Sequence, residues 1–171
     1  NLDDDSRRMD FLSHHPESIR TLTMLYSNYG TPVGYRFMDG SSVHAYKLIN
    51  DEGQVHYVKF SWKSQQGIKN LGPKEVQLMQ GRDYSHMTRD LITAIDKGDY
   101  PKWDLYIQTL RPEQLADFDF DPLDATKIWP DVPERRVGQM VLNRNVGNFF
   151  QETEQVALAP SNLIKGIEPS E

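Results

Sequence analysis

A stretch of period-two alternation near residue 60 constrains the fold more than any other feature of the sequence. In VHYVKFSWK the apolar side chains of Val58, Phe60 and Trp62 alternate with more polar ones, which is typical of a strand with one apolar face. The opposite face of this strand carries Tyr57, Lys59, Ser61 and Lys63. A strand over 43–49 precedes it, and the NDEG turn between them places Gly53 where positive φ is favoured. The two runs predict an antiparallel hairpin.

The rest of the chain contains helical and strand patterns in blocks rather than in strict alternation. Pro16 and Pro73 suit the first turn of a helix, and Gly98 suits a helix C-terminus. The sequence predicts helices over 16–26, 73–80, 84–97 and 147–158, and further strands over 103–110 and 137–143. This order favours an α+β fold with an antiparallel sheet, and 171 residues suit a single domain.

Composition excludes several classes of protein. The net charge is −6 with no run of lysine or arginine, so we expect no nucleic-acid partner and no anionic membrane surface. No apolar run approaches the length of a bilayer span. The N-terminal NLDDDSRRMDF is acidic and polar, unlike a signal peptide. The absence of cysteine favours a reducing compartment, and we expect a cytoplasmic protein.

Taken without any family, the candidate sites in the sequence are weak. The acidic run that begins at Asp117 has Pro122 and Ile128 where a calcium loop requires glycine and a bidentate carboxylate, which predicts an exposed loop. The polar residues expected at helix starts are His14, His15 and His86, the last of them facing solvent. The position of Arg144 between two asparagines in LNRN predicts that it belongs to a buried hydrogen-bond network or binds an anion or ligand. We expect no metal site.

Five blocks of the sequence, taken together, resemble the monofunctional haem catalases over nearly the whole chain. The blocks are FLSHHPESIRTLTMLYSNYGTPVGYRFMDG, VHAYKLINDEGQVHYVKFSWKSQQGIKNL, RDLITAIDKGDYPKWDLYIQ, FDPLDATKIWP and VGQMVLNRNVGNFFQETEQVALAPSNLIKGIEPS. The resemblance implies a catalase-like antiparallel β-barrel segment with helices and a long wrapping loop. We expect 1–171 to be one segment of a catalase core, with a barrel part over about 1–110 and a wrapping part over about 111–171. Proline-rich residues 111–136, which show no sustained periodicity, suit such a loop.

The same resemblance implies haem as cofactor, hydrogen peroxide as substrate and a homo-oligomer, usually a tetramer. The family's chemistry uses a distal histidine and asparagine, which lie upstream of the matched blocks, and a tyrosinate from an Arg-x-x-x-Tyr motif. No arginine of this sequence has a tyrosine four residues later. We therefore expect no catalytic residue within this chain, and no catalase activity from the chain alone.

The resemblance assigns three residues to the surroundings of the haem. His44 matches a proximal-side histidine that hydrogen-bonds the arginine supporting the tyrosinate, Val43 lies near the haem, and Ala125 lies near the haem edge. A cation beside a phenolate favours its ionised form, and a hydrogen bond to that cation orients it. From periodicity alone, His44 remains a plain strand histidine.

Many members of the family also bind NADPH, and this sequence matches the residues of that site only in part. Four residues are identical to the family's usual residues at that site or are conservative replacements of them: Ser27, Lys63, Ile128 and Trp129. Residues that depart from it are Arg20, Tyr29, Asp39, Ser61 and Asp131. The carboxylate of Asp131 repels a phosphate, so we expect no NADPH binding.

Three alternatives remain open from the sequence. The chain could be a short protein that kept the fold as a non-enzymatic ligand-binding or interaction module. It could belong to a haem protein of the same fold with different chemistry, such as hydroperoxide rearrangement. It could also be a remnant of a full catalase, in which case its one-sided apolar strands predict self-association of the isolated chain.

Overall fold

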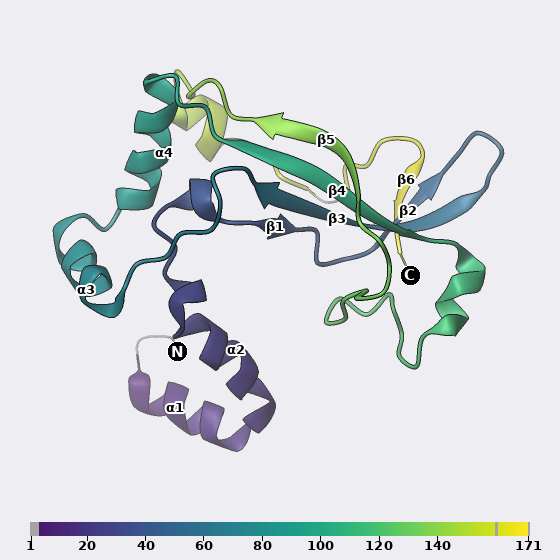
Figure 1. Cartoon of the computed structure of the whole chain (residues 1–171), viewed down its shortest axis with the longest axis horizontal. Helices are drawn as coiled ribbons and strands as arrows, with labels where there is room; N and C mark the ends of the chain where they lie inside the picture. The colour runs from purple at the N-terminus through teal and green to yellow at the C-terminus, as the bar shows by residue number, and fades with distance from the viewer. Residues whose placement is uncertain (1–3, 160, 171) are drawn as a thin grey trace.

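An antiparallel sheet with helices at one end forms the centre of the molecule (Figure 1). The computed structural model describes residues 4–159 and 161–170. The strands are β1 (Gly40–Ser41), β2 (Tyr46–Ile49), β3 (Val55–Ser64), β4 (Lys102–Leu110), β5 (Arg135–Val141) and β6 (Ile167–Pro169). Their order is β5-β4-β3-β2-β6, with β1 also paired to β3. The α+β architecture is confirmed, and the sheet of the described residues is open rather than closed into a barrel.

The predicted hairpin is present, but its first strand is interrupted. β1 ends at Ser41 and β2 begins at Tyr46, and both pair with β3, on the edge opposite β4. The expected start of the strand at Val43 is wrong, because Val43 has φ 60°, in the left-handed region that strands do not use. At this break Ser42 N–H donates to the carbonyl of Phe60 at 2.9 Å, and Ser42 Oγ accepts from Phe60 N–H at 3.1 Å.

The helices confirm most of the sequence predictions and add one α-helix and several short 3₁₀ turns. The helical elements are α1 (Asp5–His14), η1 (Pro16–Ser18), α2 (Ile19–Leu25), η2 (Asn28–Gly30), η3 (Tyr35–Phe37), α3 (Pro73–Arg82), α4 (His86–Asp96), η4 (Pro112–Asp117) and η5 (Phe150–Glu154). The unexpected helix is α1, which Asp4 caps by accepting a hydrogen bond from Arg7 N–H at 3.2 Å. The helix expected over 147–158 is reduced to a single π turn, η5. The expected positive φ is present at Gly53 and Gly98.

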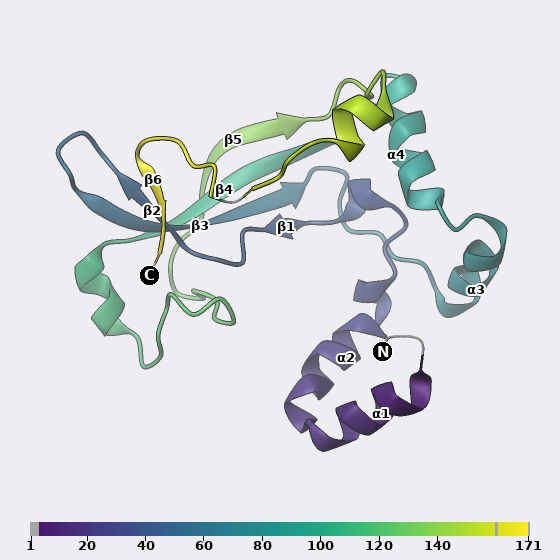
Figure 2. The same cartoon turned by 180° about the vertical axis from the view of Figure 1, so that it is seen from behind.

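Residues 111–134, which we call the covering segment, fold back over the face of β3 that carries Lys59. In Figures 1 and 2 this segment lies beside the sheet at the end away from α3 and α4. Its Trp129 is 2% exposed and packs in a cluster with Ala45 and Leu110, and its Nε1–H donates to the carbonyl of Pro122 at 2.8 Å. The covering segment therefore encloses a face that the alternation marks as polar.

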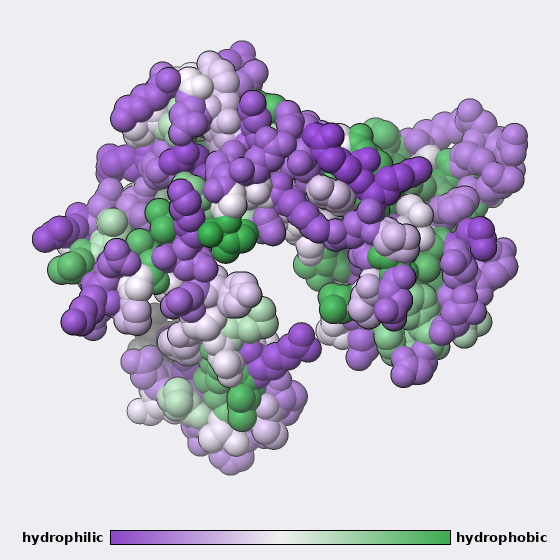
Figure 3. Space-filling view, in the orientation of Figure 1, coloured by the Kyte–Doolittle hydropathy of each residue, from purple (hydrophilic) through white to green (hydrophobic). Residues whose placement is uncertain are grey.

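Helix α4 is attached to the first third of the chain by a charged cluster. The guanidinium of Arg36, in η3, donates two hydrogen bonds to Asp90 at 2.8 and 2.9 Å and one to Asp99 at 2.9 Å. The hydrogen bond with Asp90 is the main reason that the pKa of Arg36 is raised. By contrast, α1 and α2 contain no buried residue, and apolar side chains gather on the surface of this helical pair (Figure 3).

Candidate functional site

A cavity of about 270 Å³ lies between the break in the hairpin and the covering segment. It is lined by Ser41, Ser42, Val43, Lys59, Phe60, Ser61, Gln108, Ala125, Lys127, Ile128 and Trp129. Val43 and Ala125, both assigned to the haem surroundings, thus line one cavity, although they lie far apart in the sequence. Trp129, assigned to the nucleotide site, lines the same cavity.

The cavity wall includes an unusual backbone conformation. Val43 is a β-branched residue with φ 60°, which costs on the order of 1–3 kcal/mol. Its N–H donates to Ser41 Oγ at 3.3 Å, and Ser42 Oγ donates to the carbonyl of His44 at 2.8 Å. The hydroxyl groups of two serines therefore stabilise the break that brings Val43 to the cavity.

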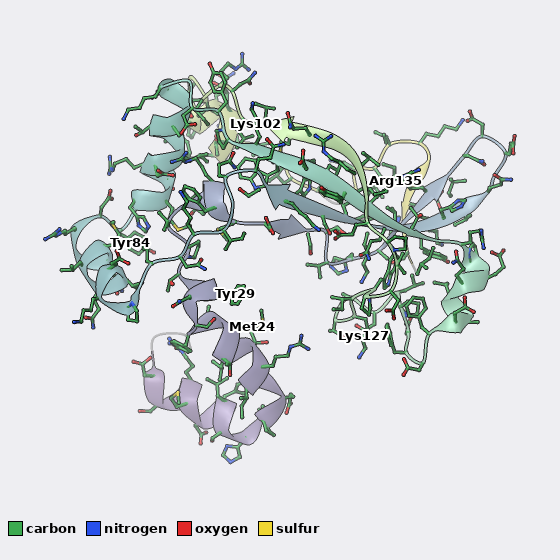
Figure 4. The ribbon with its side chains drawn as sticks, viewed as in Figure 1. Met24, Tyr29, Tyr84, Lys102, Lys127 and Arg135 are labelled. Carbon is green, nitrogen blue, oxygen red and sulfur yellow. The ribbon has the colours of Figure 1, made fainter. Side chains whose placement is uncertain are left out.

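Lys59 is the cavity residue that sequence reasoning missed. Its side chain is 8% exposed, Nζ donates to the carbonyl of Lys127 at 2.6 Å, and the ammonium lies 5.2 Å from the centroid of the Trp129 ring. Burial lowers the pKa of Lys59, and the nearby Asp124 carboxylate partly offsets this. Figure 4 shows Lys127 on the covering segment, beside the sheet. The available signal was the long connection 111–136, which had to cover some face of the sheet.

His44 lies at the break but outside the cavity lining. The residue is exposed, and its N–H donates to the carbonyl of Ser42 at 2.6 Å. Its ring is therefore accessible at the surface of the described structure, next to Val43 in the chain.

Three of the four residues that match the nucleotide site, Ser27, Lys63 and Trp129, lie in three different places, and Ile128 lies with Trp129 on the cavity lining. Trp129 lines the cavity, and Ser27 lines a separate groove of about 220 Å³ next to α2. Lys63 forms an ion pair with Glu134, and its ammonium lies 4.8 Å from the centroid of the Tyr106 ring. The hydrogen bond with Glu134 raises the pKa of Lys63. The described structure therefore does not gather these three side chains at one site.

Several other sequence candidates take different roles from those expected. The expectation of a buried Arg144 is wrong, because this residue is exposed; it is Asn145 that donates to the carbonyl of Ile92 at 2.9 Å and to Asp96 at 2.7 Å. His86 is half-buried rather than facing solvent, and its Nε2 has no hydrogen-bond partner in the described chain.

The remaining candidates add no second site. His14 ends α1 and, with His15, precedes η1 as expected, and the Nδ1 of His15 lies 3.2 Å from Glu17. Within residues 4–159 and 161–170, no three His, Cys, Asp or Glu side chains are grouped to hold a metal ion. In the same ranges, no helix combines the length and apolar character that crossing a bilayer requires.

Comparison with known proteins assigns this chain to a family. The catalase family model matches residues 1–171. The catalase of Pseudomonas aeruginosa is 77% identical over the whole chain, and that of Pseudomonas syringae pv. syringae is 75% identical. The chain spans 33% and 34% of these two proteins, about a third of their length.

Solved structures agree with the sequence relatives. The structure of catalase A from Saccharomyces cerevisiae matches with a TM-score of 0.88 and 42% identity, covering 94% of this chain and 34% of that one. A fungal catalase matches with a TM-score of 0.88 and 41% identity, covering 94% and 33%. The chain therefore belongs to the catalase family.

Proposed function

We propose that this chain is a segment of a haem catalase, which converts hydrogen peroxide to water and oxygen. The observation that carries the proposal is the family match over all 171 residues, at 77% identity to one catalase. The substrate is hydrogen peroxide, and the complete enzyme is a homo-oligomer, a tetramer in the family pattern. We assign it to the cytoplasm, in line with the absence of cysteine.

We propose that one edge of a haem lies at this cavity. Its lining includes the apolar side chains of Val43, Phe60, Ala125 and Ile128, which suit a flat apolar ring. Its volume of about 270 Å³ is below the roughly 300–1,000 Å³ of typical ligand pockets, so these residues would contact only part of the cofactor. When bound, haem supplies the iron that performs the redox chemistry.

The residues of this chain would hold and orient groups around the cofactor. Val43 and Ala125 would exclude water from the haem edge, and the serine hydroxyls at the break would keep Val43 in place. The exposed ring of His44 is free to hydrogen-bond an arginine supplied elsewhere in a protein of family length. An arginine held in this way would favour the ionised form of a tyrosine ligand.

We propose that NADPH binds weakly or not at all. Lys63, the cation among the residues that match the NADPH site, is already paired with Glu134. Ser27, Lys63 and Trp129 lie in different parts of the fold, and this separation supports the same conclusion.

Two measurements test this proposal. The purified 171-residue chain, mixed with haem, should give no intense haem absorbance band and no oxygen from peroxide; a strong band with rapid oxygen release would refute the prediction of inactivity. The second measurement uses the Pseudomonas aeruginosa catalase with its matching 171 residues exchanged for this chain. The chimera should retain haem and catalase activity, and a folded, oligomeric chimera without haem would overturn the assignment.

A separate substitution tests the placement of the haem edge beside Ala125. Ala125→Trp in the chimera should lower haem content, because the indole would fill the cavity, whereas Ala116→Trp on the exposed part of η4 should not. Equal haem content in both variants would contradict the placement of haem beside Ala125.

A further inference from the structure

The ammonium group of Lys59 is buried without an acidic partner. Among the described residues, its one hydrogen-bond acceptor is the carbonyl of Lys127, and its other close contact is the face of the Trp129 ring. Asp124 acts on it only through a longer-range charge effect. A lysine ammonium has three N–H donors, and buried charges are normally paired. Lys59 therefore retains hydrogen-bonding capacity for one more acceptor.

The cavity that Lys59 lines is suited to an anion. Its lining contains two lysines, three serines and one glutamine, and no aspartate or glutamate. This contrasts with a chain whose net charge is −6. Gln108 already donates from Nε2 to the carbonyls of Trp129 and Val132, at 2.7 and 2.6 Å. Ser42 Oγ donates to the carbonyl of His44, so Lys59 and the hydroxyls of Ser41 and Ser61 are left to donate to a ligand.

The apolar part of the lining limits the kind of anion. Val43, Phe60, Ala125 and Ile128 provide no hydrogen bonds from their side chains. Enclosing two negative charges among such groups is more costly than enclosing one. A small monoanion with a short apolar end matches this mixture of one buried cation, hydroxyl groups and apolar walls.

We propose that this cavity binds a small carboxylate, which accepts a hydrogen bond from Lys59 Nζ and lies with its apolar end against Ala125. The proposal goes beyond the haem assignment and does not depend on it, because it concerns the chain without cofactor. The carboxylate provides the negative charge that Lys59 lacks within the described structure.

The test is a titration of the haem-free 171-residue chain with sodium acetate at constant ionic strength. Two-dimensional NMR follows the Ala125 methyl group and the Trp129 indole N–H, which lie on the lining. Both signals should shift in a saturable way with the same Kd. Acetamide, which has a similar size and no charge, should leave them unchanged; equal shifts with acetamide, or shifts that never saturate, would overturn the proposal.

Matched variants identify the charge responsible. Lys59→Met should weaken acetate binding at least tenfold, which corresponds to about 1.4 kcal/mol. Lys127→Met removes the same charge from an exposed residue of the lining, whose ammonium lies 5.9 Å from the centroid of the Phe120 ring, and should change the Kd less than threefold. Equal losses in the two variants would show that only general electrostatics is involved, and would refute the site.

Two further measurements leave Lys59 in place, in case Lys59→Met does not fold. Ala125→Leu should prevent acetate binding by filling the cavity. In the unmodified chain, acetate affinity should fall as pH rises through the titration of Lys59, with Asp124 and Lys127 as the other charged groups nearby. Unchanged affinity across that range, or in Ala125→Leu, would contradict the proposal.

Discussion

Lys59 in β3 donates a hydrogen bond from Nζ to the carbonyl oxygen of Lys127 at 2.6 Å. The two residues are separated by 68 positions in the sequence, so this contact joins the hairpin to the covering segment. The same ammonium lies over the ring of Trp129. One buried lysine thus helps hold the segment that carries Ala125 and Trp129 against the strand break at Val43.

The first prediction concerns the pH dependence of stability. Burial lowers the pKa of Lys59 in the folded chain below its ordinary value of 10.5. At pH values between the folded-state pKa and the ordinary one, the unfolded chain therefore binds more protons than the folded chain. The free energy of unfolding should therefore increase as pH rises through this window, because the folded state loses the costly buried charge of Lys59.

Urea unfolding at a series of pH values, between about pH 8 and pH 11, measures this gain. The unmodified chain should become more stable relative to Lys59→Met as pH increases, since the variant has no amine at this position. A difference that stays constant, or that moves in the opposite direction, would show that Lys59 is not destabilised as a cation in the fold.

The second prediction concerns the backbone at the break. Val43→Gly should raise the free energy of unfolding by about 0.5–1 kcal/mol, because the left-handed conformation costs a non-glycine residue about 1–2 kcal/mol and glycine's greater freedom when unfolded recovers only part of this. Val43 is 53% exposed, so little apolar burial is lost. Chemical denaturation provides the measurement.

Val55→Gly is the matched control for that substitution. Val55 starts β3 and pairs with Ile49 in regular antiparallel geometry, so the same change should lower stability by roughly 1 kcal/mol. If both variants lose stability equally, the positive φ at Val43 does not strain the chain.

The third prediction separates the two carboxylates around Arg36. Asp90 accepts two of the hydrogen bonds of a guanidinium that is 14% exposed, whereas Asp99 accepts one and is 74% exposed. Asp90→Asn should lower the free energy of unfolding by about 1–2 kcal/mol, and Asp99→Asn should change it by less than about 0.5 kcal/mol. Thermal unfolding followed by near-UV circular dichroism compares them, and equal effects would show that Arg36 is not attached mainly through Asp90.

Local sequence patterns were enough to predict the strands, helices and turns that residues close together in the sequence determine. The strand around Phe60, the helix predicted over 84–97 and the turn glycines Gly53 and Gly98 all follow from short stretches of sequence, and the structure confirms them. Helix α1 escaped prediction because it has a capping aspartate but no buried face.

The candidate site was harder to predict, because contacts between distant segments determine it. Periodicity places Lys59 on a polar face, and only the covering segment makes that face buried. The left-handed turn at Val43 has no glycine or asparagine to indicate it; it follows from hydrogen bonds of Ser41 and Ser42. Family resemblance alone brought Val43 and Ala125 forward, and both line the same cavity.

The pairing of β6 with β2 leaves β2 without its outer partner strand while the chain is being synthesised. Tyr46 and Leu48 pair with Pro169 and Ile167, which lie far from them in the sequence. A ribosome that adds about 5–20 residues per second delivers β6 on the order of ten seconds after β2. During that interval the outer edge of β2 presents free backbone donors and acceptors to other nascent chains, so this edge is where chaperone protection would matter most.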